Sequence, residues 1–201
     1  MGAGSLPLDR QVLEQLRRLW HDERRRLATR LAPGLTADET GGRLAAIGVA
    51  APAELLVWWG WHNGTQNEAH ATMTDTGFAF LGIDWAVQAA VRHRGYAPDR
   101  VLLDQPWDPT VAAARQAEWG QTLVPISRSP AGFLVVDCYR ADAMSPVWFF
   151  DREGGDHDAL PLFRSMREMV EHMISRTSDA LSKDAFQQAD GGVASNPTDI
   201  V

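Results

Sequence analysis

The chain has 201 residues, of which 45% are hydrophobic and 22% are charged. These values are ordinary for a globular protein and exclude the disordered, collagen-like and membrane-spanning classes. The formal net charge is −7, but the first 32 residues carry seven Arg against four carboxylates, which leaves −10 on the remainder. An acidic body repels nucleic-acid phosphates and attracts partners that have a basic surface.

The single cysteine, Cys138, cannot form an internal disulfide and is typical of a reducing compartment. No basic segment followed by an apolar one opens the chain, so we expect no signal peptide. The longest apolar run, 53–61, is far shorter than the roughly 20 residues that span a bilayer. We therefore predict a cytoplasmic protein, and the excess of Arg over Lys suggests a bacterial one.

Three helices are predicted near the start of the chain. Residues 9–31 place apolar side chains three, four or seven positions apart, as on an amphipathic helix. A Thr-x-x-Glu capping box begins a second helix over 36–47. The very apolar segment 53–61 is a third helix, which His62-Asn63-Gly64 is expected to cap through the left-handed conformation. The apolar positions of the first helix are Leu13, Leu16, Trp20, Leu27 and Leu31.

The middle of the chain mixes both kinds of element. We predict a strand at 78–81, then a helix at 84–94 that Asp84 caps. An Ala-rich stretch is expected to be helical as far as residue 119.

The last third changes to strands. Three β-rich runs are predicted as strands, at 123–126, 132–139 and 146–150. An acidic loop follows, and a last helix begins near Pro161 with Phe163 on its apolar stripe.

This order of elements predicts an α+β fold. It consists of N-terminal helices, a central mainly antiparallel sheet and a closing C-terminal helix. We expect a single domain over 1–178, with the first helix as an added element. Residues 179–201 are expected to form a polar, disordered tail.

The tryptophans of the third helix, Trp58, Trp59 and Trp61, are the most conspicuous candidate site. Trp is enriched at binding hot spots, so one of them could anchor a partner. Adjacent residues of a helix point to different faces, however, so at least one must be buried. The core interpretation is favoured, with Trp58 or Trp61 as the candidate that reaches the surface.

An acidic run follows the last predicted strand. Its pattern fails as a calcium loop, because Asp156 stands where an EF-hand needs Gly and Leu162 stands where it needs Glu. It is either a solvated turn or an acidic docking surface that steers a basic partner. The candidate docking residues are Asp151, Glu153, Asp156 and Asp158.

No other residue pattern predicts chemistry. The six His residues are scattered, so we predict no metal, no cofactor and no catalytic residue. Cys138 shares a strand face with apolar residues and is expected in the core. Asp137 points the other way and is expected to accept hydrogen bonds that fix a neighbouring turn. The Arg-rich run at 24–26 is interpreted as a solvated helix face.

Several of these segments resemble the SUKH superfamily. Pro52-Ala-Glu-Leu-Leu-Val-Trp-Trp-Gly-Trp-His-Asn63-Gly64 is similar to its early helix motif, which ends on Asn-Gly. Trp119-Gly-Gln-Thr-Leu-Val-Pro-Ile126 is similar to its strand that enters on an apolar-Pro-Ile signature, and Gly132-Phe-Leu-Val-Val-Asp137 to its Gly-x-x-apolar-apolar-Asp strand. The resemblance covers about residues 36–175, and the Arg-rich first helix is an addition to it.

The resemblance implies a non-enzymatic domain. Members are mostly bacterial immunity proteins that bind and neutralise a cognate toxin, often a nuclease, while fungal relatives act in cell-wall regulation. We therefore expect an immunity-type protein whose partner is a toxin with a basic surface. The alternatives are a regulatory protein-binding scaffold and, less favoured, a small hydrolase whose site is not evident. The oligomeric state is left open.

Overall fold

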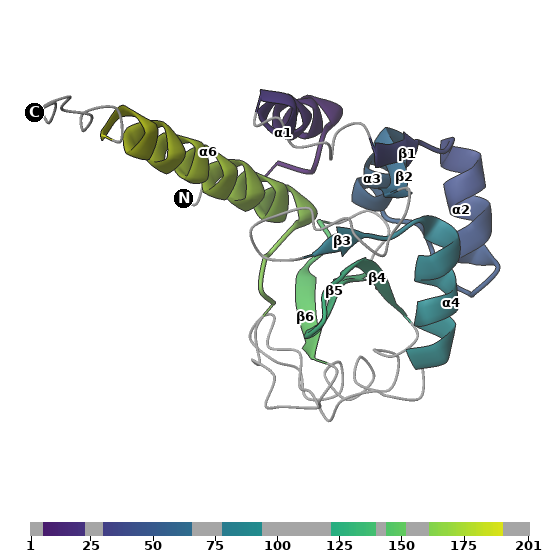
Figure 1. Cartoon of the computed structure of the whole chain (residues 1–201). Coiled ribbons are helices and arrows are strands. Elements are labelled where there is room, and N and C mark those ends of the chain that lie inside the picture. Colours follow the sequence, from purple (N-terminus) through teal and green to yellow (C-terminus); the bar gives the residue numbers. More distant parts are fainter. Residues whose placement is uncertain are drawn as a thin grey trace, which may run out of the picture.

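The computed structural model describes residues 6–22, 30–65, 78–93, 122–139, 144–151 and 161–190. Over these ranges the chain is an α+β protein with antiparallel sheets, as expected (Figure 1). The helices are α1 (Arg10–Asp22), α2 (Ala37–Ala45), α3 (Ala53–Trp61), α4 (Ile83–His93) and α6 (Met166–Asp190). The strands are β1 (Leu31–Pro33), β2 (His62–Thr65), β3 (Ala79–Phe80), β4 (Leu123–Arg128), β5 (Gly132–Asp137) and β6 (Val147–Asp151).

The larger sheet has four strands in the order β3-β4-β5-β6, all antiparallel. The register of β4 against β5 shifts between Pro125 and Ser127. Proline has no N–H to give to a central ladder, so a bulge beside it is the expected accommodation. The next residue, Ile126, stays buried and accepts a hydrogen bond from Leu81 N. The smaller sheet pairs β1 with β2.

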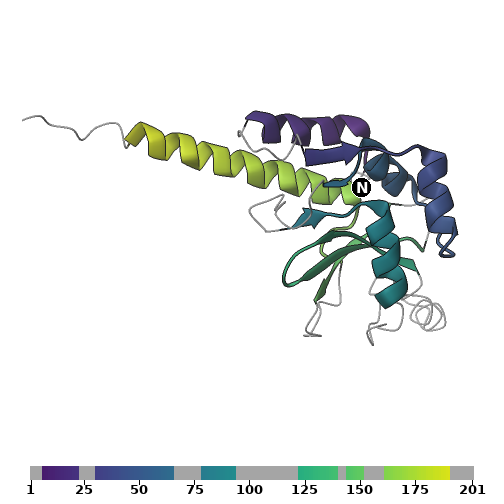
Figure 2. The same cartoon turned by 45° about the vertical axis from the view of Figure 1, so that its right-hand side comes forward.

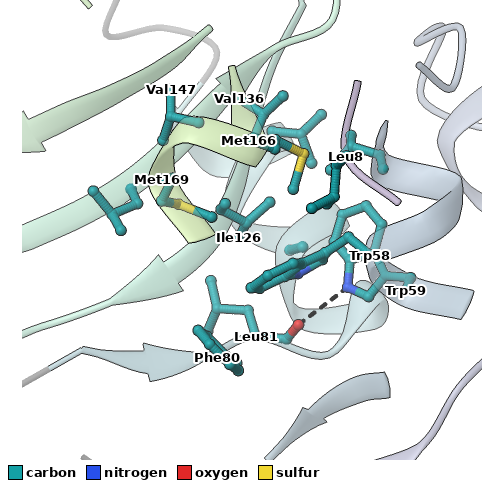
Figure 3. Close-up of a cluster of buried hydrophobic side chains, with 14 of the residues drawn as sticks. Leu8, Trp58, Trp59, Phe80, Leu81, Ile126, Val136, Val147, Met166 and Met169 are labelled. Atoms are coloured by element: carbon teal, nitrogen blue, oxygen red, sulfur yellow. Dashed lines mark hydrogen bonds between the residues drawn. The ribbon is translucent and has the colours of Figure 1, made fainter. Parts of the chain in front are cut away.

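Both faces of the four-stranded sheet are covered. Every residue of β5 is buried, which is the pattern of a strand enclosed on two sides. On one face the Trp85 ring of α4 lies 5.9 Å from the ring of Phe133. On the other face Met166, at the start of α6, lies beside Val136 (Figure 3). The core therefore extends from the sheet to α6.

Helices α1 and α6 lie side by side, and α6 continues well beyond the end of α1 (Figures 1 and 2). Helix α1 begins where the Asp9 carboxylate accepts a hydrogen bond from Val12 N at 3.0 Å. The same carboxylate pairs with Arg167 of α6 at 2.9 Å. Burial of Leu13 and Trp20 confirms the apolar stripe predicted for this helix.

The predicted helix over 9–31 is wrong at its C-terminal end. Helix α1 ends at Asp22, residues 23–29 lie outside the described part, and Leu31 begins β1. Leu31 is a strand residue because it pairs with Thr65, a partner 34 positions away that helical spacing cannot reveal. The capping box of α2 is confirmed, since Thr36 and Glu39 exchange both hydrogen bonds.

The expected helix cap at residues 62–64 is a strand. His62 is extended, with φ −157°, and β2 starts there. Gly64 does adopt the left-handed conformation, with φ 78°, but inside β2, where a Cβ atom would overlap the backbone of Gly82. Asp84 is not the cap of α4 either. The N-terminus of α4 is capped by the Asn63 side chain, whose oxygen accepts a hydrogen bond from Ile83 N at 2.8 Å.

The C-terminal prediction needs two corrections. Phe163 is not helical, because its backbone exchanges two hydrogen bonds with Val147 of β6, and α6 begins at Met166. Helix α6 then continues to Asp190, so the first part of the expected tail over 179–201 is helical. The strands predicted at 78–81, 123–126, 132–139 and 146–150 are confirmed. The Ala-rich stretch before residue 119 lies outside the described residues.

Candidate partner-binding surface

The three tryptophans of α3 belong to the core. Trp58 and Trp59 are completely buried and Trp61 is 8% exposed, so neither Trp58 nor Trp61 is the surface anchor considered from sequence. The physical reason is that α3 is apolar on nearly every face, and five of its nine residues, the three tryptophans among them, are buried. The Trp59 indole donates a hydrogen bond to the Leu81 carbonyl at 3.1 Å, which ties the helix to the residue after β3 (Figure 3).

Helix α1 covers the remaining face of this cluster. Its Trp20 ring lies 6.1 Å from the ring of Trp61 and 5.6 Å from that of Phe80. Trp58 meets Phe80 edge-on at 4.7 Å. Aromatic pairs at these distances add roughly 0.5–1.5 kcal/mol each beyond the burial of their area. The added first helix is therefore an integral part of the core.

His62 lies inside the same aromatic cluster. Its ring stacks on Phe80 at 4.9 Å and meets Trp58 and Trp61 edge-on at 5.0 and 4.5 Å. Nδ1 accepts a hydrogen bond from Gly64 N at 3.0 Å, so in the neutral ring the hydrogen is on Nε2. Burial lowers the pKa of His62 from 6.5 to about 3, because the charged form would lose its hydration.

The acidic candidates extend from the end of β6. Asp151 is the last residue of that strand and pairs with Gly132. Glu153, Asp156 and Asp158 lie outside the described residues. The structure thus places the start of this run at the end of an outer strand, opposite the end where α6 begins.

A buried carboxylate that the sequence analysis missed lies in the first turn of α3. Glu54 is 1% exposed and accepts three backbone hydrogen bonds, from Leu8 N at 2.8 Å, Ser145 N at 2.7 Å and Met166 N at 3.3 Å. These donors lie before α1, before β6 and at the start of α6. The signal was present in the sequence, because Glu54 is the only charged residue in an otherwise apolar helix.

Asp137 and Cys138 have the roles expected of them. The Asp137 carboxylate accepts hydrogen bonds from Tyr139 N and from the Thr122 hydroxyl, each at 3.0 Å, and so fixes the turn after β5. Cys138 is buried. Burial, together with the charge of Asp137, raises the pKa of its thiol well above the ordinary value. Such a thiol is a core residue and a poor nucleophile.

Several of the described residues that carry the family resemblance make contacts that determine the fold. Trp59 and Asn63 bond to the segment that links β3 and α4, and Gly64 lies against it. A Cβ atom on Gly132 would overlap the Phe150 carbonyl oxygen of the neighbouring strand. Asp137 holds the end of β5. These positions set the geometry of the sheet and its helices.

In comparisons with known proteins, no protein-family model matches this chain, and no curated protein matches it in sequence. Within the described ranges, no helix is both long enough and apolar enough to cross a bilayer. The same ranges contain no group of three or more His, Cys, Asp or Glu side chains that could hold a metal ion.

Proposed function

We propose that this protein is an immunity-type protein of the cytoplasm, which binds a cognate bacterial toxin with a basic surface and neutralises it by covering that surface. It acts by contact and catalyses no reaction. A nuclease is a suitable toxin, because a surface that grips phosphates is basic and is complementary to an acidic inhibitor.

The observation that carries the proposal is the distribution of charge. The chain beyond its first 32 residues has a net charge of −10. Long-range attraction between such a body and a basic partner raises the association rate and suppresses partners of the wrong charge. An inhibitor that must reach its toxin before the toxin reaches nucleic acid benefits from both effects.

The resemblance to the SUKH superfamily supports the same proposal through the fold. Its signature positions in this chain, Asn63, Gly64, Gly132 and Asp137, each make a contact that their residue type explains. Together these positions form the frame of this fold. The frame alone leaves the partner open, because one fold hosts many functions.

The test is a pull-down of the tagged protein from its native host, with bound proteins identified by mass spectrometry. We expect one large secreted-type protein in stoichiometric amount, held through a basic C-terminal domain. That domain, purified, should be toxic when expressed alone and harmless when this protein is co-expressed. Recovery of endogenous signalling or cell-wall proteins instead would replace the proposal with a regulatory scaffold. No stoichiometric partner would refute both.

A further inference from the structure

Most of the large apolar side chains that are exposed among the described residues lie near the end of the four-stranded sheet where β6 begins. Among the described residues five large apolar side chains are exposed. One of them, Val91, lies on α4 and is 50% exposed. The other four are Leu6 (64%), Tyr139 (39%), Met144 (39%) and Leu162 (52%). We call these four residues the anchor patch.

The four residues of the anchor patch lie on four different segments of the chain. Hydrogen bonds of three consecutive residues, 145–147, bring these segments together. Ser145 N donates to the Glu54 carboxylate, which also accepts from Leu8 N, so the segment of Leu6 is held there. Met144 is the neighbour of Ser145 in the chain.

The next two residues hold the other two segments. The Pro146 carbonyl accepts a hydrogen bond from Asp137 N, two residues before Tyr139. The backbone of Val147 exchanges two hydrogen bonds with Phe163, which is adjacent to Leu162. Because two residues span at most about 7 Å, Tyr139, Met144 and Leu162 lie near the 145–147 segment. Leu6 lies two residues from Leu8, whose N–H shares the Glu54 carboxylate with that of Ser145.

Such a concentration is the usual mark of an interface. Exposed apolar groups scattered singly need no explanation, whereas a cluster of them identifies a binding surface. Tyr and Met are also among the residues enriched at interface centres. Burial of Trp58 and Trp61 leaves the proposed function without the apolar anchor expected from sequence, and the anchor patch is an exposed set that fills this role.

The charges beside the patch select the kind of partner. The described segments that carry it, residues 6–10, 132–139, 144–151 and 161–171, hold five carboxylates against three guanidinium groups. The carboxylates are those of Asp9, Asp137, Asp151, Glu168 and Glu171, and the guanidinium groups are those of Arg10, Arg164 and Arg167. A second copy of this chain would meet the same negative field and be repelled, whereas a basic protein would be attracted.

We infer that the anchor patch is the apolar centre of the partner-binding surface, and that it takes an apolar protrusion flanked by Lys or Arg on a basic protein. This inference rests on the proposed function, whose partner it would bind. The patch lies near Val147, the first residue of β6. Asp151 is the last residue of that strand, four residues later and about 13 Å away. One interface of ordinary size covers both.

The experiment compares two aliphatic residues that are equally exposed but lie in different places. Leu162→Asp alters the patch, and Val91→Asp is the matched control, since the two side chains are 52% and 50% exposed. Circular dichroism and a thermal melt establish that each variant folds. The probe is the purified basic domain of the partner identified by the pull-down, titrated at physiological salt. We expect Leu162→Asp to weaken binding about tenfold or more, and Val91→Asp to change it by less than about twofold.

Hydrogen exchange of the wild-type complex gives an independent readout if Leu162→Asp does not fold. Amides of residues 144, 145 and 147 and of residues 162–165 should be protected by the partner, while those around Val91 should be unchanged. Equal binding by both variants, or protection elsewhere, would overturn the inference while the proposed function stands. A change from dimer to monomer in Leu162→Asp would also overturn it, by making a second copy the occupant. Failure to recover any partner would refute the proposed function and the inference together.

Discussion

Replacement of Glu54 tests whether one buried carboxylate holds three distant parts of the chain together. Its oxygens accept hydrogen bonds from Leu8 N, Ser145 N and Met166 N. Two of these contacts, at 2.8 and 2.7 Å, have the short distances of charge-assisted bonds. The third is at the start of α6, where the helix dipole also favours a negative charge.

The cost of losing this carboxylate is large compared with the stability of an ordinary domain. A hydrogen bond to a charged group contributes about 1.5–3 kcal/mol, and each N–H left buried without an acceptor costs about 1–3 kcal/mol. Water can enter the space that Glu54→Ala opens and recover part of this. We therefore expect a loss of about 3–5 kcal/mol, out of the roughly 5–15 kcal/mol that a domain has.

Glu54→Gln separates the hydrogen bonds from the side-chain volume. The amide oxygen can still accept from Ser145 N and Met166 N, but its NH2 group would face Leu8 N as a second donor. We expect a loss of about 1.5–3 kcal/mol, between those of the wild type and Glu54→Ala. The matched control is Glu168→Gln, because that exposed carboxylate accepts a single backbone hydrogen bond, from Arg164 N at 2.7 Å. Its loss should stay below about 1 kcal/mol.

The assay is urea unfolding at neutral pH, followed by tryptophan fluorescence and extrapolated linearly to water. The buried tryptophans of α3 give a signal that changes on unfolding. If Glu54→Ala unfolded within 1 kcal/mol of the wild type with an unchanged slope, the carboxylate would not hold the three segments. A cost for Glu168→Gln equal to that for Glu54→Gln would refute the role assigned to burial.

Three further measurements follow from the described contacts. Gly42→Ala should raise the free energy of unfolding by roughly 0.5–1 kcal/mol in the same urea assay, because its Cβ would meet open space in helix α2. Gly132→Ala should lower the free energy of unfolding, because its Cβ would overlap a neighbouring strand. Asn63→Ala should cost about 1 kcal/mol by removing the acceptor for Ile83 N, and Asn63→Asp should keep most of it. Since His62 has its pKa lowered to about 3 in the folded state, unfolding takes up a proton below the ordinary value of 6.5, so stability falls as pH falls through that window. His62→Phe should remove roughly 1.5 kcal/mol of that loss between about pH 6.5 and pH 5, and equal pH dependence of the two proteins would refute the buried neutral ring.

Elements with a signal inside their own sequence could be predicted. The capping box of Thr36 and Glu39 is a local exchange of hydrogen bonds, and the structure contains both of them. The apolar stripe of α1 and the β-rich runs of the sheet were also recognisable from spacing and residue type. In each case the residues within one helix or strand contain the necessary information.

Elements that depend on a distant partner were assigned wrongly. Leu31 fits a helical stripe, but its pairing with Thr65 makes it a strand residue. Phe163 fits the stripe of the last helix, but its pairing with Val147 keeps it extended. Asn63 caps a helix that begins 20 residues further on, so no local pattern assigns it that task. Hydrogen bonding and packing against a distant strand stabilise these residues more than the weak helical preference of a short segment does.

The residues of the candidate site likewise include some that could be predicted from the sequence and some that could not. That most of the tryptophan cluster lies in the core could be predicted, because a helix that is apolar on every side must be enclosed. That Trp61 is covered as well depends on Trp20, which arrives from α1. Glu54 could have been identified as special from its place in an apolar helix, but its three donors are 46, 91 and 112 residues away.

The residues that carry the resemblance and those that carry the proposed binding differ for a physical reason. Gly132 and Asp137 satisfy contacts inside the chain, so their types are constrained by the chain itself and form a readable pattern. Leu162 and Met144 are exposed, and nothing within the described chain requires an apolar side chain there. Under the proposed function their constraint comes from a partner, so their positions follow no spacing rule and become related only where the 145–147 segment assembles them. Exchange of the anchor patch between two proteins of this frame should therefore transfer partner choice while leaving the fold intact.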